Sequence, residues 1–180
     1  MFPPNIMVKN LKKINNESIP NMVSSTQRIA RLSIFTTLTV VGSFIHLPSP
    51  IQSVAFDSSP GFFAALYFGI WEGALISGIG HMVTSIISGF PLGVYHLPIA
   101  FSMALAGGTI GLINKLNKKW GFIPAIILGI AVNTASVVLV VPLIGWAGAI
   151  AFIPSLLLSA SLNGILAVIV FLGIKGKKLF

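Results

Sequence analysis

The sequence has no cysteine, only three acidic residues and few charges of either sign, since charged residues make up 8% of its 180 positions. Without cysteine the chain forms no disulfide, no thiolate metal site and no cysteine nucleophile. A soluble domain is about 25% charged, so this composition cannot provide a water-facing surface. It excludes a soluble enzyme, a disordered chain and a nucleic-acid-binding domain, and it predicts an integral membrane protein of one domain. Positions 32 to 174 hold five charged residues: Asp57, Glu72, Lys115, Lys118 and Lys119.

Turn residues divide the apolar sequence into six candidate membrane-spanning helices. The first ends at Leu47-Pro48-Ser49-Pro50, because proline lacks an N–H and disfavours helix in the residue before it. Pro60 suits a first helical position, with Ser58 or Ser59 as the cap. A polar tail over residues 1–26 is expected to be partly disordered, and a basic tail covers residues 175–180. At about 20 apolar residues per crossing, the helices cover residues 27–46, 60–69, 73–88, 96–113, 122–141 and 149–174.

Basic residues decide between six crossings and five, because the short segments 60–69 and 73–88 could fuse into one helix. With six crossings all 11 Lys and Arg residues lie on one side of the membrane, as the positive-inside rule expects of the cytoplasmic side. Five crossings would place the last two basic clusters outside. The sequence therefore predicts an all-α bundle of six transmembrane helices with both termini in the cytoplasm. A cleaved signal peptide at residues 27–46 is the disfavoured alternative, because its apolar stretch is long for one.

Small residues at four-residue spacing mark two helix surfaces, since membrane helices pack closely through such residues. On the fourth helix this pattern favours packing within the bundle over contact with a partner. Ser33 and Thr37 repeat the spacing on the first helix, where both interpretations stay open. The residues of the fourth helix are Ala100, Ala104 and Gly108, with the GxxxG pair Gly107 and Gly111.

Polar side chains gather toward the outer half of the predicted bundle. Unsatisfied polar groups cost several kcal/mol in lipid, so these side chains must face one another, water or a ligand. Together with Asp57, the only acidic residue on the outer side, and Asn133, they describe a concave site that opens outward. Two helices carry them on single faces: Ser77, His81, Thr84, Ser85 and Ser88 on residues 73–88, and Ser155, Ser159 and Asn163 on residues 149–174.

Each of these residues also has a simpler interpretation. His81 could bond a neighbouring helix, although ionisable residues within a membrane are functional by default. Asp57 could cap the helix at 60–69. Asn133 and Asn163 could join helices by hydrogen bonds. At the edges of the membrane, His46 and His96 are expected at the wet interface and Glu72 in a cytoplasmic turn.

Several kinds of chemistry are disfavoured by what the sequence contains. It has no phosphate-binding G-x-x-x-x-G-K-[ST] loop, so ATP hydrolysis of that kind is excluded. The three histidines lie on separate elements without ligand spacing, so no metal is expected. Ser77-Gly78 followed by His81 is too common a string to indicate a serine hydrolase. A proton-coupled carrier, with His81 titrating in the membrane, stays as an alternative.

The pattern of helices and motifs resembles the S component, the substrate-binding membrane subunit of energy-coupling factor (ECF) vitamin transporters, over about residues 27–172. The resemblance implies a non-catalytic binding protein in a prokaryotic plasma membrane, without a cofactor, that works with a scaffold subunit and two ATPase subunits. In that family the first helix meets the scaffold through an Ala-x-x-x-Ala stripe, and Ser33 and Thr37 occupy the matching places. Three runs are similar to the branch called CblT, proposed to import α-ribazole for cobalamin salvage: Asp57-Ser58-Ser59-Pro60-Gly61-Phe62, Gly80-His81 and Gly89-Phe90-Pro91-Leu92-Gly93.

The outer site suits such a ligand, because a dimethylbenzimidazole ring requires aromatic faces and a ribose requires polar partners. Other flat vitamins, of the pyrimidine, flavin or pantothenate type, fit nearly as well, so the exact substrate stays open. The expected polar contacts are Asp57, His81, Asn133 and Asn163, and the ring contacts are Phe56, Phe90, Tyr95 and Trp146, with His96 beside them.

Overall fold

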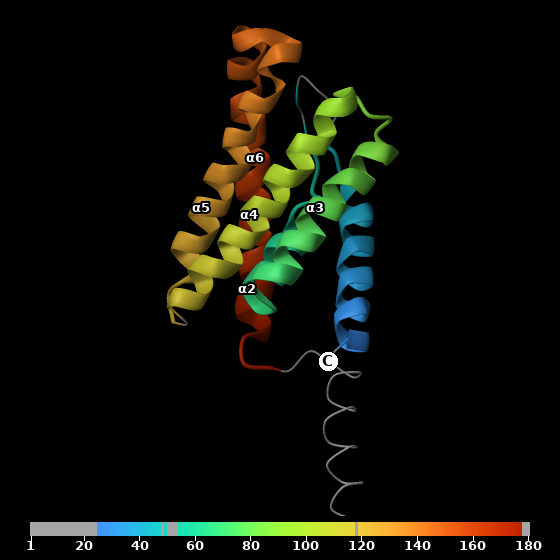
Figure 1. Cartoon of the computed structure of the whole chain (residues 1–180). Helices are drawn as coiled ribbons and strands as arrows, with labels where there is room; N and C mark the ends of the chain where they lie inside the picture. Colours follow the sequence, from blue (N-terminus) through green and yellow to red (C-terminus); the bar gives the residue numbers. More distant parts are fainter. Residues whose placement is uncertain (1–24, 48, 50–53, 118, 178–180) are drawn as a thin grey trace, which may run out of the picture.

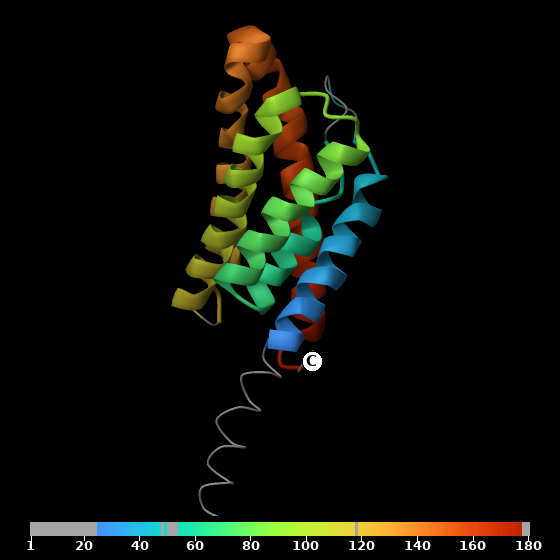
Figure 2. The same cartoon turned by 45° about the vertical axis from the view of Figure 1, so that its right-hand side comes forward.

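The chain folds into a bundle of helices in the computed structural model, which describes residues 25–47, 49, 54–117 and 119–177 (Figure 1). The start of the first helix and the end of α6 lie at the same end of the bundle (Figures 1 and 2). The tail predicted to be disordered falls almost entirely outside the described residues. A helix over residues 25–43 is followed by α2 (Ser59–Tyr67), α3 (Ile70–Ile87), the 3₁₀ helix η1 (Gly93–Tyr95), α4 (His96–Leu116), α5 (Phe122–Ala135), the 3₁₀ helix η2 (Ser136–Val140) and α6 (Val141–Ile174).

Three helical stretches among the described residues are long and apolar enough to cross a bilayer: Ile70–Ile87, Gly93–Leu116 and Phe122–Ile174. The third contains α5, η2 and α6, and α5 and α6 run in opposite directions within it (Figure 1). The helical path of α6 breaks at Gly145, whose φ of 69° and ψ of 171° are conformations that glycine adopts without strain. The count of six crossings and the side on which the termini lie therefore stay predictions.

Two of the predicted helix starts agree with the structure, whereas α6 begins at Val141 and not at residue 149, and α3 also differs. As predicted, α4 begins at His96 and α5 at Phe122. In contrast, α3 begins at Ile70, so Glu72 lies within its first turn. A carboxylate is favoured there by the positive end of the helix, and Glu72 lies 3.6 Å from the guanidinium of Arg28 on the first helix. The position predicted for Glu72, in a turn between helices, is wrong.

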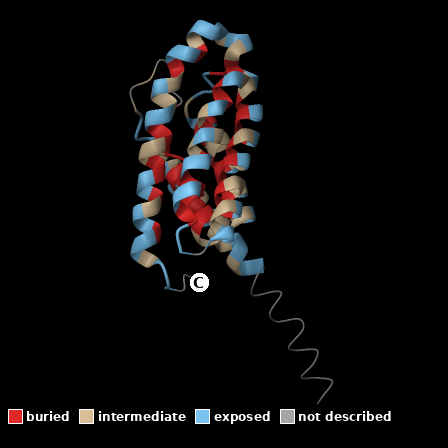
Figure 3. Ribbon diagram, turned by 90° about the vertical axis from the view of Figure 1, so that its left-hand side faces the viewer, coloured by how far each residue is buried: buried red, intermediate tan, exposed pale blue. Residues whose placement is uncertain are grey.

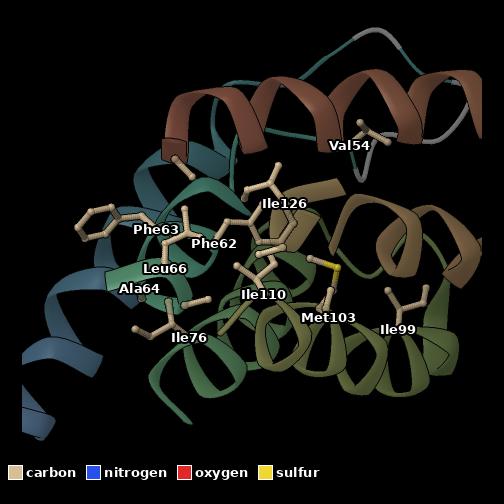
Figure 4. Close-up of a cluster of buried hydrophobic side chains, with 14 of the residues drawn as sticks. Val54, Phe62, Phe63, Ala64, Leu66, Ile76, Ile99, Met103, Ile110 and Ile126 are labelled. Atoms are coloured by element: carbon tan, nitrogen blue, oxygen red, sulfur yellow. The ribbon is translucent and has the colours of Figure 1, made fainter. Parts of the chain in front are cut away.

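The short helix α2 lies at the centre of the core, with seven of its nine residues buried. Phe62 is fully buried, and it belongs to the same cluster as Ile76 of α3 and Ile110 of α4 (Figure 4). Nine residues rise only about 14 Å, about half the thickness of a bilayer core. The preceding residues 54–58 are also largely buried, and irregular backbone is tolerated at membrane depth where protein surrounds it.

Exposed residues face outward from the bundle and buried residues lie inside (Figure 3), and many of the exposed residues are large and apolar. Phe101 of α4, Ile127 of α5 and Ile169 of α6 are each at least 60% exposed. A monomeric soluble protein rarely exposes apolar patches on this scale. The distribution indicates a lipid-facing surface, as the composition predicts.

Small residues bring α3 and α4 into close contact. A Cβ on Gly107 would overlap the carbonyl oxygen of Gly73, and a Cβ on Gly78 would lie 3.2 Å from the carbonyl oxygen of Ala100 and 3.1 Å from the Cβ of Ala104. Such approach is how membrane helices associate without a hydrophobic driving force. The interpretation of this stripe as packing within the bundle is confirmed.

Candidate functional site

The loop that leads into α2 is tied to the end of the first helix. The backbone N–H of Leu47 donates to the carbonyl oxygen of Val54 at 2.9 Å, and the N–H of Phe56 donates to that of Ile45 at 3.1 Å. Because the backbone forms these bonds, the loop keeps its path inside the bundle without being helical. This path fixes the direction in which the next residue, Asp57, enters the structure.

Two residues of α6 hold the same loop from the opposite side. The side-chain amide of Asn163 donates to the carbonyl oxygen of Ala55 at 3.0 Å, and its oxygen accepts the backbone N–H of Ser59 at 2.8 Å. The hydroxyl of Ser159 donates to the same Ala55 carbonyl at 3.1 Å. Asn163 is fully buried, and both of its amide atoms are used within the chain. In this structure it therefore positions the loop and does not line the cavity described below.

The first N–H group of α2 is satisfied by this distant asparagine and not by a local cap. Neither Ser58 nor Asp57 caps the helix through its side chain; the Ser58 hydroxyl donates to the Asp57 carboxylate at 3.1 Å instead. Ser58 occupies the N-cap position, as predicted, although its side chain makes no capping hydrogen bond. The alternative that Asp57 caps this helix is wrong. A helix N-terminus accepts any well-placed oxygen, and here α6 supplies it.

Asp57 is 8% exposed and lies against α3. Burial raises the pKa of its carboxyl to about 6, well above the ordinary value, although the hydroxyls of Ser58 and Thr84 lower it. Burial disfavours the charged form because a carboxylate loses its hydration there. A group of this kind needs a hydrogen-bond donor to remain ionised, and a ligand hydroxyl would provide one.

Asp57, His81 and Asn133 line one cavity between the loop and α3, α4, α5 and α6. The side-chain amide of Asn133 has no hydrogen-bond partner among the described residues. The cavity measures about 50 Å³, whereas pockets for drug-sized ligands measure about 300–1,000 Å³, so the site is nearly closed. The other lining residues are Val54, Ala55, Ser58, Leu92, Ile99, Met103, Ser136, Val137, Val140, Phe152, Leu156 and Ser159.

His81 on α3 contacts His96 at the start of α4. The Nε2 atom of His81 lies 3.2 Å from the Nδ1 atom of His96. His96 Nδ1 also lies 2.8 Å from the Ser85 hydroxyl, and its Nε2 accepts the backbone N–H of Leu92 at 3.2 Å. His96 is fully buried, so its predicted position at the wet interface is wrong. The contact between the two histidines could not be predicted, because 15 positions separate them and no local pattern joins them.

The turn between α3 and η1 brings Leu92 to that histidine. Gly89 and Phe90 both have positive φ, of 75° and 52°, and such a value is uncommon for a residue with a side chain. The Phe90 ring packs edge-on against the His96 ring, with centroids 5.7 Å apart. Phe90 and Leu92, which both lie in this turn, thus contact the imidazole of His96.

The aromatic residues expected around a ligand ring do not line the cavity in this structure. Phe56 lines a separate apolar groove beside the first helix, Phe90 packs on His96, Tyr95 packs against the core, and Trp146 is 66% exposed. The aromatic residue that does line the cavity is Phe152 of α6. Its spacing of seven residues from Ser159 places both on one helix face, which is the signal that could have identified it.

The two small residues of the first helix face outward. Ser33 and Thr37 are both exposed, and the Thr37 hydroxyl donates to the Ser33 carbonyl oxygen at 2.8 Å. Because the Thr37 hydroxyl bonds a carbonyl of its own helix, it needs no other partner. The helix surface at these two small residues is then free of unsatisfied polar groups. The stripe is therefore accessible to a partner helix, and internal packing does not account for it.

A comparison with protein families identifies the chain. The family described as "ECF transporter, substrate-specific component" matches residues 27–175, which is most of the sequence. The chain belongs to this family. As an S component it is a membrane-embedded, substrate-binding subunit of a vitamin-type transporter, from a family of binding subunits and not of enzymes. Such a subunit binds a small-molecule substrate and has an ECF module as its partner. No curated protein and no solved structure matches the chain.

Proposed function

We propose that this S component binds a flat, nucleoside-like vitamin precursor in the cavity, with α-ribazole as the first candidate. The observation that carries the proposal is the convergence of Asp57, His81 and Asn133 on one cavity that is otherwise lined mostly by apolar side chains. Ligand sites have this composition, with a few placed polar groups in an apolar wall. α-Ribazole in particular is supported by the similarity of three short runs to the CblT branch.

The polar and aromatic residues of the cavity have distinct roles in this proposal. Asp57 accepts hydrogen bonds from ribose hydroxyls, and His81 and Asn133 bond the remaining polar atoms. Phe152 and the aliphatic residues contact the flat ring. Asn163 acts on the ligand only through the loop that it holds. This assignment removes Phe56 and Trp146 from the closed site.

Binding requires the closed cavity to expand, because a nucleoside is far larger than about 50 Å³. The loop of residues 54–58 is the wall without regular structure, and four hydrogen bonds hold it, from the backbone of Leu47, to that of Ile45, and from the side chains of Asn163 and Ser159. Each contributes only about 1 kcal/mol net. We therefore assign entry of the ligand to displacement of this loop.

Around this site we propose six crossings, with both termini in the cytoplasm of a prokaryotic cell. The partners are a scaffold subunit, reached through Ser33 and Thr37, and two ATPase subunits. Single cysteines in this cysteine-free chain test the orientation by impermeant labelling of intact cells. Asn117→Cys should be labelled only after permeabilisation, and Trp146→Cys from outside. External labelling of Asn117→Cys would overturn the six-crossing arrangement.

Binding is tested by calorimetry on the purified chain with α-ribazole, riboflavin, thiamine and pantothenate as separate probes. A ligand present at 100 times its Kd should also raise the stability of the folded state by about 2.7 kcal/mol, visible as a higher Tm. Binding of α-ribazole alone supports the proposal. Preference for one of the other three would retain the site and replace the substrate.

The alternative function, a proton-coupled carrier complete in itself, is distinguished by transport. Liposomes that contain only this chain should not accumulate α-ribazole under a pH gradient. Addition of the scaffold and ATPase subunits with internal ATP should start uptake. Uptake by the chain alone would overturn the assignment of the energy source to a separate module.

A further inference from the structure

We infer that His96 and Ser85 hold His81 in one neutral tautomer, with a hydrogen on Nδ1 and none on Nε2, so that His81 offers the ligand a hydrogen-bond donor. His96 and Ser85 are then positioning residues that determine specificity without contacting the ligand. The consequence for the ligand rests on the proposed function, whereas the tautomer itself does not.

The hydrogens of His96 follow from its partners. Its Nε2 accepts the N–H of Leu92 at 3.2 Å, so that nitrogen carries no hydrogen. A neutral imidazole has one hydrogen on one of its two nitrogens. The hydrogen of His96 is therefore on Nδ1. A protonated His96 is excluded as well, because its Nε2–H would then face the N–H of Leu92, and two donors do not bond each other.

Ser85 uses its single hydrogen elsewhere. Its hydroxyl donates to the backbone carbonyl oxygen of His81 at 2.7 Å, so toward His96 Nδ1, at 2.8 Å, it can only accept. The hydrogen bonds of Ser85 therefore fit His96 Nδ1 as a donor, in the tautomer that the Leu92 N–H requires.

The tautomer of His81 follows from that of His96. His81 Nε2 lies 3.2 Å from His96 Nδ1, and a hydrogen on both nitrogens would bring two donors together. His81 Nε2 is therefore the second acceptor of a shared hydrogen bond, and the hydrogen of His81 is on Nδ1. That N–H has no hydrogen-bond partner among the described residues, and His81 is partly exposed on the cavity wall.

This arrangement specifies the chemistry of the ligand. The atom opposite His81 must be an acceptor, such as an unsubstituted ring nitrogen or a carbonyl oxygen, while Asp57 requires a donor such as a hydroxyl. A benzimidazole nucleoside offers both, since one ring nitrogen is free and the ribose carries hydroxyls. Ligands with an N–H or a quaternised nitrogen at that point are rejected, because a buried donor left unpaired is costly.

The tautomer is measured without any ligand by ¹⁵N NMR of the histidine-labelled chain at neutral pH, since the shifts of the two ring nitrogens distinguish the tautomers. His46→Gln identifies the signals of the one other histidine, and the His96 variants below distinguish His81 from His96. We expect both His81 and His96 as neutral Nδ1–H forms. A neutral Nε2–H form or a charged imidazolium at His81 would overturn the inference, whatever α-ribazole does.

Variants of His96 separate positioning from packing. Asparagine places an amide nitrogen near the position of imidazole Nδ1, so His96→Asn should keep the tautomer of His81 and bind α-ribazole within threefold of the unchanged chain. His96→Leu fills the space without a donor, so His81 should become a mixture of tautomers and bind about tenfold more weakly. Equal NMR spectra of His81 in both variants would overturn the role of His96.

A ligand pair provides the matching test on the other side of the contact. α-Ribazole and its derivative methylated on the free ring nitrogen differ in the acceptor that His81 requires. We expect the methylated form to lose at least tenfold in affinity to the unchanged chain, and the loss to shrink in His81→Leu. If neither compound binds while the tautomers are as inferred, the proposed substrate fails and the positioning by His96 stands. Equal affinity of the two compounds for the unchanged chain would overturn the specificity argument.

Discussion

Asn163, within α6, accepts a hydrogen bond from the backbone N–H of Ser59, which lies 104 positions earlier in the chain. The same side chain donates to the carbonyl oxygen of Ala55. One amide therefore caps a helix and holds the loop before it. Since the loop carries Asp57 into the cavity, the geometry of the candidate site depends on a residue that does not line it.

Removal of this amide should destabilise the fold and weaken binding together. Asn163→Ala leaves the Ser59 N–H without this partner, and a buried unsatisfied group costs about 1–3 kcal/mol. We expect a fall of that size in the free energy of unfolding, measured by denaturant titration in detergent. Ser159→Ala is the matched control, because it removes one of two hydrogen bonds to Ala55 and should cost less. An equal cost for both variants would contradict the capping role of Asn163.

Asp57 and His81 should each contribute directly to binding. Loss of one partner of a buried hydrogen bond costs about 1–3 kcal/mol, so Asp57→Ala and His81→Ala should weaken α-ribazole binding by about tenfold to a hundredfold, as measured by calorimetry. Glu72→Ala is the control, because Glu72 pairs with Arg28 far along α3 from the cavity. Unchanged affinity in both site variants, with the fold intact, would remove them from the ligand site.

The buried carboxyl of Asp57 should give stability a characteristic dependence on pH. Its pKa is raised to about 6, so the folded state binds the proton more tightly than the unfolded state. The free energy of unfolding therefore falls as the pH rises between about 4 and 6, and this contribution amounts to about 3 kcal/mol.

Asp57→Asn should remove this dependence, because the amide does not titrate. The variant should exceed the unchanged chain in stability at pH 7 and resemble it at pH 4, while binding the ligand more weakly. Unfolding of both proteins from pH 4 to 8 measures the difference. A variant less stable than the unchanged chain at pH 7 would show that the carboxylate is already compensated in the fold.

Much of the fold could be predicted from the sequence, because membrane-spanning helices can be identified from their local composition. Pro and Gly mark the boundaries, and α4 and α5 begin where predicted. The small residues of α4 also identified a packing surface, since close approach requires them on any helix. The start of α3 was predicted wrongly, because a charged residue such as Glu72 is typical of a turn and the sequence gives no sign that Arg28 pairs with it.

The candidate site was harder to predict, because its contacts join residues that are distant in sequence. The single polar residues His81, Asn133 and Asp57 could be selected by type and depth, and the structure places them around one cavity. Neither the capping by Asn163 nor the burial of His96 has a local signal. The aromatic residues were chosen by type alone, and type does not specify direction, so Phe56 and Trp146 lie elsewhere and Phe152 was overlooked.

The outward stripe of the first helix should govern assembly and leave binding intact. Ser33→Leu or Thr37→Leu adds bulk where a partner helix must approach closely, so each should reduce co-purification with the scaffold and ATPase subunits several-fold. Both positions are exposed and lie outside the cavity, so the affinity of the isolated chain for α-ribazole should stay within a factor of two. Ala151→Leu, at an exposed position of α6, makes a similar change without touching the stripe and should assemble normally. Normal assembly of both first-helix variants would show that the scaffold meets another surface, because leucine at these positions cannot be accommodated without separating two closely packed helices.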